Sequence, residues 1–164
     1  MPSPGSDSKI FPPGSVGFEV AFDSWFVGCS KRSGGKVCTM WQHQYEQRTS
    51  KRVLSVEIKK FTKNGVDFVL VLPFGLIFDS GVEVRVDGER FVGKRLSGKL
   101  SFKTCLPSGC VVDLHLDARQ LGALYRGAVL EVKAVGSEGS IPLSIPLKGF
   151  ESAYKYLESV SSSK

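Results

Sequence analysis

Short segments in which apolar and polar residues alternate are the feature that most constrains the fold of this chain. A period of two places apolar side chains on one face of a strand and polar side chains on the other. Two further segments also favour strands: Phe68–Leu72 is apolar throughout, as in a strand covered on both faces, and Val37–Tyr45 is rich in aromatic and β-favouring residues. The alternating segments are Leu54–Lys59, Val82–Asp87, Leu100–Thr104, Val112–Leu116 and Val129–Val135.

Glycine-containing dipeptides separate these segments, as turns between antiparallel strands require. They are Asn64-Gly65, Ser80-Gly81 and Asp87-Gly88. Several short strands at this spacing predict an all-β fold, mainly antiparallel, in the form of a sandwich or a partly open barrel.

Two short helices are expected to interrupt the strands. Asp117 is followed three residues later by Gln120, the arrangement of a capping box, and Gly127 is placed to end that helix. The second helix is expected at the C-terminus, packed back on the sheet through residues at helical spacing. These residues are Phe150, Tyr154 and Leu157.

The length of the chain fits one domain. A protein of 164 residues buries roughly 70% of the surface of its unfolded chain, so a core forms without help from disulfides. We expect a flexible lead-in over residues 1–17, which are rich in Pro, Ser and Gly, a β-rich domain over 18–160 and a frayed tail over 161–164. The longest apolar run, Val66–Phe78, is interrupted by charged and turn-forming residues, so no transmembrane span is expected.

The four cysteines fall into two pairs that are close in sequence. Pairing neighbours gives Cys29 with Cys38 and Cys105 with Cys110, and each pair would flank a glycine-containing loop between two strands. A zinc site is the weaker interpretation, because the spacings are C-x₈-C and C-x₄-C and neither histidine lies at a finger-like distance. Free or regulatory thiols are the third alternative.

Disulfides imply an oxidising compartment, so we expect a protein of the periplasm or cell envelope, or a secreted one. The first eight residues lack the charged and apolar regions of a signal peptide. The sequence therefore predicts an exported protein whose leader peptide is absent from this chain.

The two histidines are the only candidates for a catalytic base or a ring-binding platform that the sequence offers. His115 shares a strand face with Asp113, which could orient it as the base of a periplasmic hydrolase or lyase. A solvated outer face is the favoured interpretation, since no nucleophile is identifiable beside these residues. His43 shares a face with Trp41 and Tyr45, where a ring could stack, although a half-buried aromatic face of the core is the simpler interpretation.

Catalytic motifs of the common enzyme classes are otherwise missing. The sequence contains no G-x-S-x-G, H-E-x-x-H, P-loop or G-x-G-x-x-G motif in the required context. We expect a non-enzymatic protein without cofactor or metal.

Basic residues gather in two stretches. Residues 29–63 hold nine Lys and Arg against two acidic residues, a larger surplus than the net charge of +6 for the whole chain. Residues 85–103 hold six against two. If the fold brings these stretches together, they form a positive patch suited to anionic partners; the alternative is a merely solubilising surface. The candidate partner-binding residues are Lys31, Arg32, Lys36, Lys51 and Arg52.

Lipopolysaccharide, glycans and acidic proteins are the anionic partners that an exported protein would meet, so nucleic acid is not expected. A cytosolic nucleic-acid-binding barrel is the less favoured alternative, prompted by the pI of about 9.2 and by Trp41 and Tyr45. It requires reduced cysteines.

An ordered set of motifs resembles the invasion-associated locus B family over about residues 18–157. The most specific elements are F-x-T-C-x-P-x-G-C, here Phe102–Cys110, and the terminal L-x-G-F, here Leu147–Phe150. The other elements are Trp25–Cys29, Cys38–Gln42 and Leu72–Leu76.

This resemblance implies an exported protein of a Gram-negative bacterium, from a family named for a member linked to entry into red blood cells. It carries over no catalytic residue. The paired cysteines of the family map onto Cys29, Cys38, Cys105 and Cys110, which supports pairing between neighbours. We therefore expect a disulfide-stabilised β-domain of the envelope that acts in invasion by binding.

Overall fold

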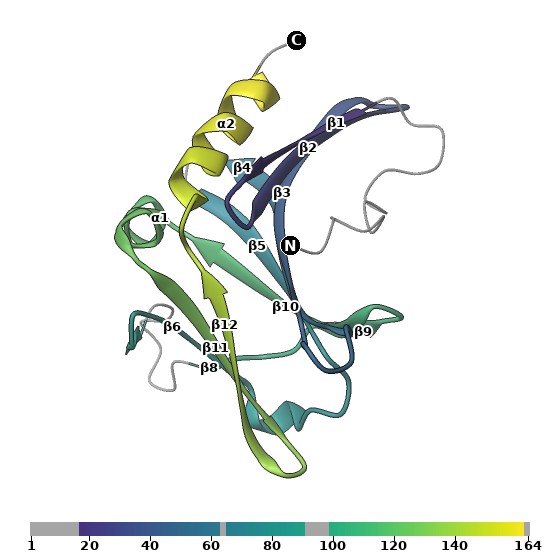
Figure 1. Ribbon diagram of the computed structural model, residues 1–164, viewed down its shortest axis with the longest axis vertical. Helices are drawn as coiled ribbons and strands as arrows, with labels where there is room; N and C mark the ends of the chain where they lie inside the picture. Colours follow the sequence, from purple (N-terminus) through teal and green to yellow (C-terminus); the bar gives the residue numbers. More distant parts are fainter. Residues whose placement is uncertain (1–16, 63–64, 91–98, 163–164) are drawn as a thin grey trace.

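The computed structural model describes residues 17–62, 65–90 and 99–162, and its strands form two antiparallel sheets (Figure 1). The expected lead-in over 1–17 therefore lies outside the described residues except for Gly17. The larger sheet has seven strands in the order β1-β2-β3-β4-β5-β10-β9. Their bounds are Gly17–Phe22 (β1), Trp25–Arg32 (β2), Gly35–Tyr45 (β3), Arg52–Thr62 (β4), Gly65–Leu72 (β5), Gly109–Leu116 (β10) and Thr104–Leu106 (β9).

The smaller sheet has the strand order β12-β11-β6-β7, with β8 also paired to β6. Its bounds are Gly139–Pro146 (β12), Val129–Gly136 (β11), Val82–Val86 (β6), Glu89–Arg90 (β7) and Lys99–Leu100 (β8). The helical elements are a short 3-10 helix, Phe78–Ser80 (η1), and two α-helices, Ala118–Arg126 (α1) and Phe150–Ser162 (α2). The predicted class, an antiparallel all-β fold with two short helices of which one is C-terminal, is confirmed.

One apolar core lies between the facing sides of the two sheets. Alternate residues of the larger sheet point into it, as Met40, Val56 and Leu70 show, each of which is 0% exposed. Val84 and Val132 of the smaller sheet belong to the same cluster of buried side chains. The core therefore forms because the period-two patterns of distant strands place their apolar faces opposite one another.

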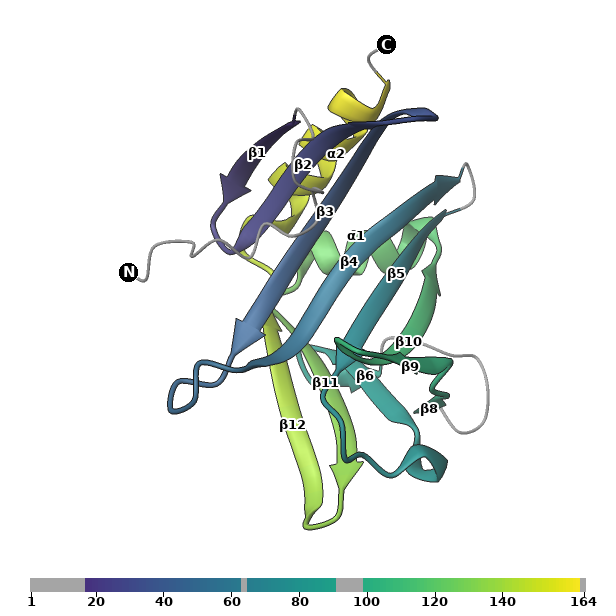
Figure 2. The same ribbon diagram turned by 90° about the vertical axis from the view of Figure 1, so that its right-hand side faces the viewer.

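Helix α2 covers the part of the larger sheet formed by β1, β2 and β3 (Figures 1 and 2). Its first residue, Phe150, is fully buried, and its ring centroid lies 5.1 Å from that of Trp25 and 6.1 Å from that of Phe68. The expected packing of a C-terminal helix on the sheet is confirmed. The helix reaches Ser162, two residues into the segment expected to be a tail.

Helix α1 begins with the capping box that the sequence predicts. The backbone N–H of Gln120 donates to Oδ1 of Asp117 at 2.8 Å, and the backbone N–H of Asp117 donates to Oε1 of Gln120 at 2.9 Å. Two otherwise unpaired helix-end donors are satisfied in this way. Gly127 follows as the C-cap. Within the described part of the chain, neither helix has the length and apolarity that crossing a membrane requires.

The turn between β12 and α2 ties the two sheets together. The carbonyl oxygen of Pro146 accepts hydrogen bonds from Nε1 of Trp25 and Nε2 of Gln42, both at 3.1 Å. Because both donor side chains are buried, losing either bond would leave a polar group unpaired away from water. Gly149 has φ +87°, and a Cβ added to it would overlap the carbonyl oxygen of Phe22. This close approach fixes the start of α2 against the turn between β1 and β2.

One expected strand is divided between the two sheets. The pattern over Leu100–Thr104 predicts a single strand, yet the chain forms β8 in the smaller sheet and β9 in the larger one. Between them Phe102 packs against Phe78, with ring centroids 4.7 Å apart, and the backbone N–H of Lys103 donates to Val111. The alternating pattern correctly indicated that Leu100 and Phe102 are half-buried. It could not show that the chain passes from one sheet to the other here, because that depends on pairing with strands that are distant in sequence.

Replacing Gly149 by alanine should destabilise the fold by about 3 kcal/mol, because the new Cβ meets backbone and the φ angle disfavours any L side chain. Gly75→Ala is the matched control, since Gly75 has φ +86° but open space around the added Cβ. It should lose only about 1 kcal/mol. Urea unfolding followed by circular dichroism measures both values, and equal losses would show that the close approach at Gly149 contributes nothing.

Two tyrosines that meet between α1 and α2, half-buried Tyr125 and buried Tyr154, should make the protein sensitive to alkali. Burial raises the pKa of Tyr125 and of Tyr154 to about 12 from the ordinary value of 10.0. The unfolded chain loses these protons at lower pH than the folded protein, so this stabilisation is complete below about pH 10 and declines from there to about pH 12. Urea midpoints measured across this range should fall less steeply for Tyr125→Phe and Tyr154→Phe, and an unchanged slope would contradict the assignment.

Candidate functional site

The turn between β2 and β3 presents cationic side chains on a disulfide-linked ribbon, and we call residues 31–36 the basic hairpin. Cys29 pairs with Cys38 in the strand register, and their sulfur atoms are bonded at 2.08 Å. Two residues further along, Lys31 lies opposite Lys36, and both side chains are exposed. The side chain of Arg32 is outside the described part, although its backbone belongs to the same hairpin. The disulfide therefore lies only two residue pairs along the ribbon from the two lysines.

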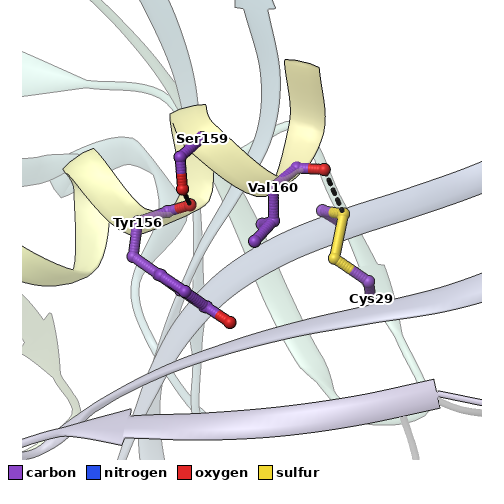
Figure 3. Close-up of a disulfide and its surroundings, with 5 residues drawn as sticks. Cys29, Tyr156, Ser159 and Val160 are labelled. Atoms are coloured by element: carbon purple, nitrogen blue, oxygen red, sulfur yellow. Dashed lines mark hydrogen bonds between the residues drawn. A yellow bond between two sulfur atoms is a disulfide. The ribbon is translucent and has the colours of Figure 1, made fainter. Parts of the chain in front are cut away.

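The carboxyl end of α2 supports this ribbon from the core side (Figure 3). Sγ of Cys38 lies 3.8 Å from the carbonyl oxygen of Val160. A disulfide sulfur carries no hydrogen, so this is a packing contact rather than a hydrogen bond. Lys31 and Lys36 lie on the same sheet face as the disulfide, because each is two residues from a cysteine on its own strand.

The structure does not bring all five candidate cations together. Lys51 and Arg52 precede and begin β4, where Arg52 pairs with Tyr45 at the far end of β3. Nine residue steps along β3 separate Tyr45 from Lys36, which at about 3.3 Å per residue is roughly 30 Å. The candidate set thus forms two separate groups at opposite ends of the same strand. Only the strand register reveals this separation.

The second disulfide joins β9 to β10. Sγ of Cys105 and Sγ of Cys110 are 2.03 Å apart, and the two residues are directly opposite in the register. Gly109 of this hairpin has φ +142°, and a Cβ added there would overlap the carbonyl oxygen of Leu72 in β5. This link holds the sheet edge closely against β5. No cysteine is free.

His115 is paired with a carboxylate, but not with the one that its sequence neighbourhood indicates. Its Nδ1 lies 2.7 Å from Oδ1 of Asp67, the residue directly opposite it on β5. The expected partner, Asp113, is instead bound by Nζ of Lys103 at 2.6 Å. The Asp113–His115 pair, which the sequence offered only as the alternative to a solvated outer face, is not formed, because directly opposed residues of neighbouring strands lie closer than residues two apart on one strand.

The surroundings of His115 are open to solvent. The side chains of His115 and Asp67 are 54% and 44% exposed, so water is not excluded from the pair. Among the residues that the structure describes, no group of His, Cys, Asp and Glu is arranged to hold a metal ion.

Trp41 does not offer a ring face to a ligand. It is only 4% exposed, and it stacks on Phe26 with ring centroids 5.9 Å apart and planes at 18°. Next to it, Nδ1 of His43 lies 2.7 Å from Oγ of Ser55. Only Tyr45 remains well exposed, at 45%. This row is an internally packed part of the sheet, so the hypothesis of a ring-binding platform loses its central residue.

Comparison with known proteins gives one family. The family model described as invasion associated locus B (IalB) protein matches residues 25–158. An invasion protein B homologue of Brucella abortus strain 2308 is 31% identical over 152 residues, covering 92% of this chain and 84% of that protein. Invasion protein B of Bartonella bacilliformis is 28% identical over 153 residues, covering 91% and 79%.

A solved structure supports the fold. The crystal structure of invasion associated protein B from Bartonella henselae matches with a TM-score of 0.76 at 24% identity. The match covers 88% of this chain and 97% of that one. Both sheets and both helices therefore belong to an architecture that has been observed experimentally.

Removing the two disulfides separately should give different losses of stability. Cys29→Ala/Cys38→Ala opens a link over 9 residues and should cost about 3 kcal/mol, whereas Cys105→Ala/Cys110→Ala opens one over 5 residues and should cost about 2 kcal/mol. Burial of Cys29 and the contact of Cys38 with α2 increase the first loss. Denaturant unfolding of each double variant checks the order, and a larger loss for the second pair would refute it.

Proposed function

The chain belongs to the invasion-associated locus B family, and from that premise we propose that it is an exported, non-enzymatic binding domain of the bacterial envelope that acts in host-cell entry. Its relatives are named invasion proteins. Two disulfides without a free thiol are typical of proteins that work in an oxidising compartment, here the periplasm or the exterior. The red blood cell is the host cell that the family resemblance implies.

The basic hairpin is the surface that we assign to the partner. Its exposed lysines, Lys31 and Lys36, face each other across a ribbon that a disulfide and α2 hold in place. Little ordering of the backbone is then needed when a partner binds. Two exposed cations on adjacent strands suit phosphate, carboxylate or sulfate groups, as on lipopolysaccharide, sialylated glycans or acidic proteins. This assignment rests on one observation: two lysines face each other on a pair of strands that the Cys29–Cys38 disulfide joins.

The non-enzymatic assignment follows from the state of the best catalytic candidate. His115 has an orienting carboxylate in Asp67, but the pair is solvated. Among the residues that the structure describes, the contact of its ring is with this carboxylate and not with a nucleophile that it could activate. The hydrolase alternative has no further support from the geometry.

Charge reversal tests the assignment of the hairpin. Lys31→Glu/Lys36→Glu should weaken binding to heparin, lipid A vesicles and red-cell membranes by roughly tenfold or more near 0.1 M salt, because several unit charges change sign at one place. Comparing the three ligands shows which anion is preferred. Lys31→Gln/Lys36→Gln should give an intermediate loss, because it removes the two positive charges without adding negative ones.

The matched control lies at the other end of the same strand. Lys51→Glu/Arg52→Glu changes the net charge by the same amount and should alter binding less than about threefold. Equal losses from the two reversals would show that total charge, rather than the basic hairpin, governs binding. Thermal unfolding of every variant verifies that the fold is intact.

A further inference from the structure

The segment that connects β5 to β6 exposes large apolar side chains, and we call residues 73–78 the apolar loop. Phe74 is 60% exposed, Ile77 45% and Phe78 51%. Soluble domains expose single apolar side chains routinely, but rarely three within five residues. The loop lies at the end of the molecule remote from the basic hairpin, near the turn between β11 and β12 (Figures 1 and 2).

The apolar loop is held firmly by the rest of the fold. The backbone N–H of Ile77 donates to the carbonyl oxygen of Val135 at 2.8 Å, and Leu76 forms an isolated bridge with Gly136 of β11. Backbone hydrogen bonds from Ser80 to Ile77 and from Gly81 to Phe78 close the turn of η1. The ring of Phe102 packs on Phe78 at a centroid distance of 4.7 Å. The exposed side chains are therefore presented in fixed positions, so little conformational entropy would be lost when they are covered.

The size of the exposed surface indicates what covers it. At about 200 Å² for a large apolar side chain, the three exposed fractions amount to roughly 300 Å². A stable protein interface buries about 800 Å² on each partner, of which somewhat more than half is apolar, so this patch offers less apolar area than a second copy of the chain would need. Shallow insertion into a lipid surface requires only a few apolar side chains at a protruding position.

The charges beside the loop point to apolar rather than ionic attraction. Asp79 follows Phe78 directly, and Glu138 lies in the turn after Gly136. Of the cations, Lys99 lies beside Gly81, and Lys103, next to Phe102, is bound by Asp113. Among the described residues of this region, cations therefore do not outnumber acids. Binding through this loop should therefore need no anionic lipid and should survive high salt.

From these observations we propose that the apolar loop inserts into a lipid surface and holds the domain against a membrane. The basic hairpin then points away from that membrane, because the two surfaces are at opposite ends of the molecule (Figure 2). The lipid contact stands independently of the partner proposed for the hairpin.

Sedimentation with phosphatidylcholine vesicles in high salt tests the proposal. The wild-type protein should sediment with the vesicles, and Phe74→Ser/Ile77→Ser should lower the partition coefficient roughly tenfold or more, since two of the three inserted side chains are lost. Val37→Ser/Tyr45→Ser is the matched control, because it removes one β-branched and one aromatic residue of similar exposure elsewhere and should leave partitioning unchanged. Lys31→Glu/Lys36→Glu should also partition normally, which separates this test from that of the hairpin.

A fluorescent probe gives a direct second readout. Both native tryptophans are buried, so a Phe74→Trp variant adds an exposed indole whose emission should shift to the blue and be quenched by brominated lipid. Failure of the wild-type protein to sediment together with an unquenched probe would overturn the proposal. So would self-association that Phe74→Ser/Ile77→Ser abolishes in analytical ultracentrifugation, which would assign the loop to a second copy instead.

Discussion

The carbonyl oxygen of Pro146 is the point on which the arrangement of this domain depends. It accepts hydrogen bonds from two buried donors, Trp25 and Gln42, that belong to the other sheet. A buried donor left without a partner is unfavourable, so the two sheets and the start of α2 keep one relative position. The helix then runs across β1 to β3 and reaches the Cys29–Cys38 disulfide. The hydrogen bonds to Pro146 at the start of α2 therefore help to fix the position of the basic hairpin, which lies near the other end of that helix.

The disulfides reinforce hairpins instead of joining the sheets. Each links two directly opposed residues of neighbouring strands, with only 9 and 5 residues of sequence separation. Links over such short loops restrict the unfolded chain only moderately. The connection between the sheets rests on apolar burial and on the turn after β12. What the disulfides add is local: rigid edges and a rigid basic hairpin.

Two surfaces with different chemistry lie at opposite ends of the molecule. The basic hairpin is polar and cationic, whereas the apolar loop is nearly neutral and carries exposed aromatic residues. Both are short turns fixed from behind, one by a disulfide and α2 and the other by β11 and Phe102. Such turns allow a rigid β-domain to contact two partners at once without moving its core. This arrangement is compatible with both proposed contacts, one with a lipid surface and one with an anionic partner.

The sequence by itself determined the features that depend on near neighbours. Period-two alternation marks strands wherever one face is buried, and the capping box at Asp117 needs only four consecutive residues. The pairing of cysteines that are close in sequence is also local. The patterns missed β1, β2, β7 and β12. Strand β12 carries two prolines, which an edge strand tolerates but which weaken its signal.

Only the tertiary structure decided which residues lie opposite one another on neighbouring strands. The strand register placed Asp67 rather than Asp113 beside His115, and it separated Lys51 and Arg52 from the basic hairpin. Packing between strands turned Trp41 into a covered residue, while the connection around η1 left Phe74 exposed. Local pattern fixes which face of a strand a side chain occupies, but its neighbours across the sheet come from residues many positions away. Pairing energy between distant strands, which the chain acquires only on folding, sets those neighbours.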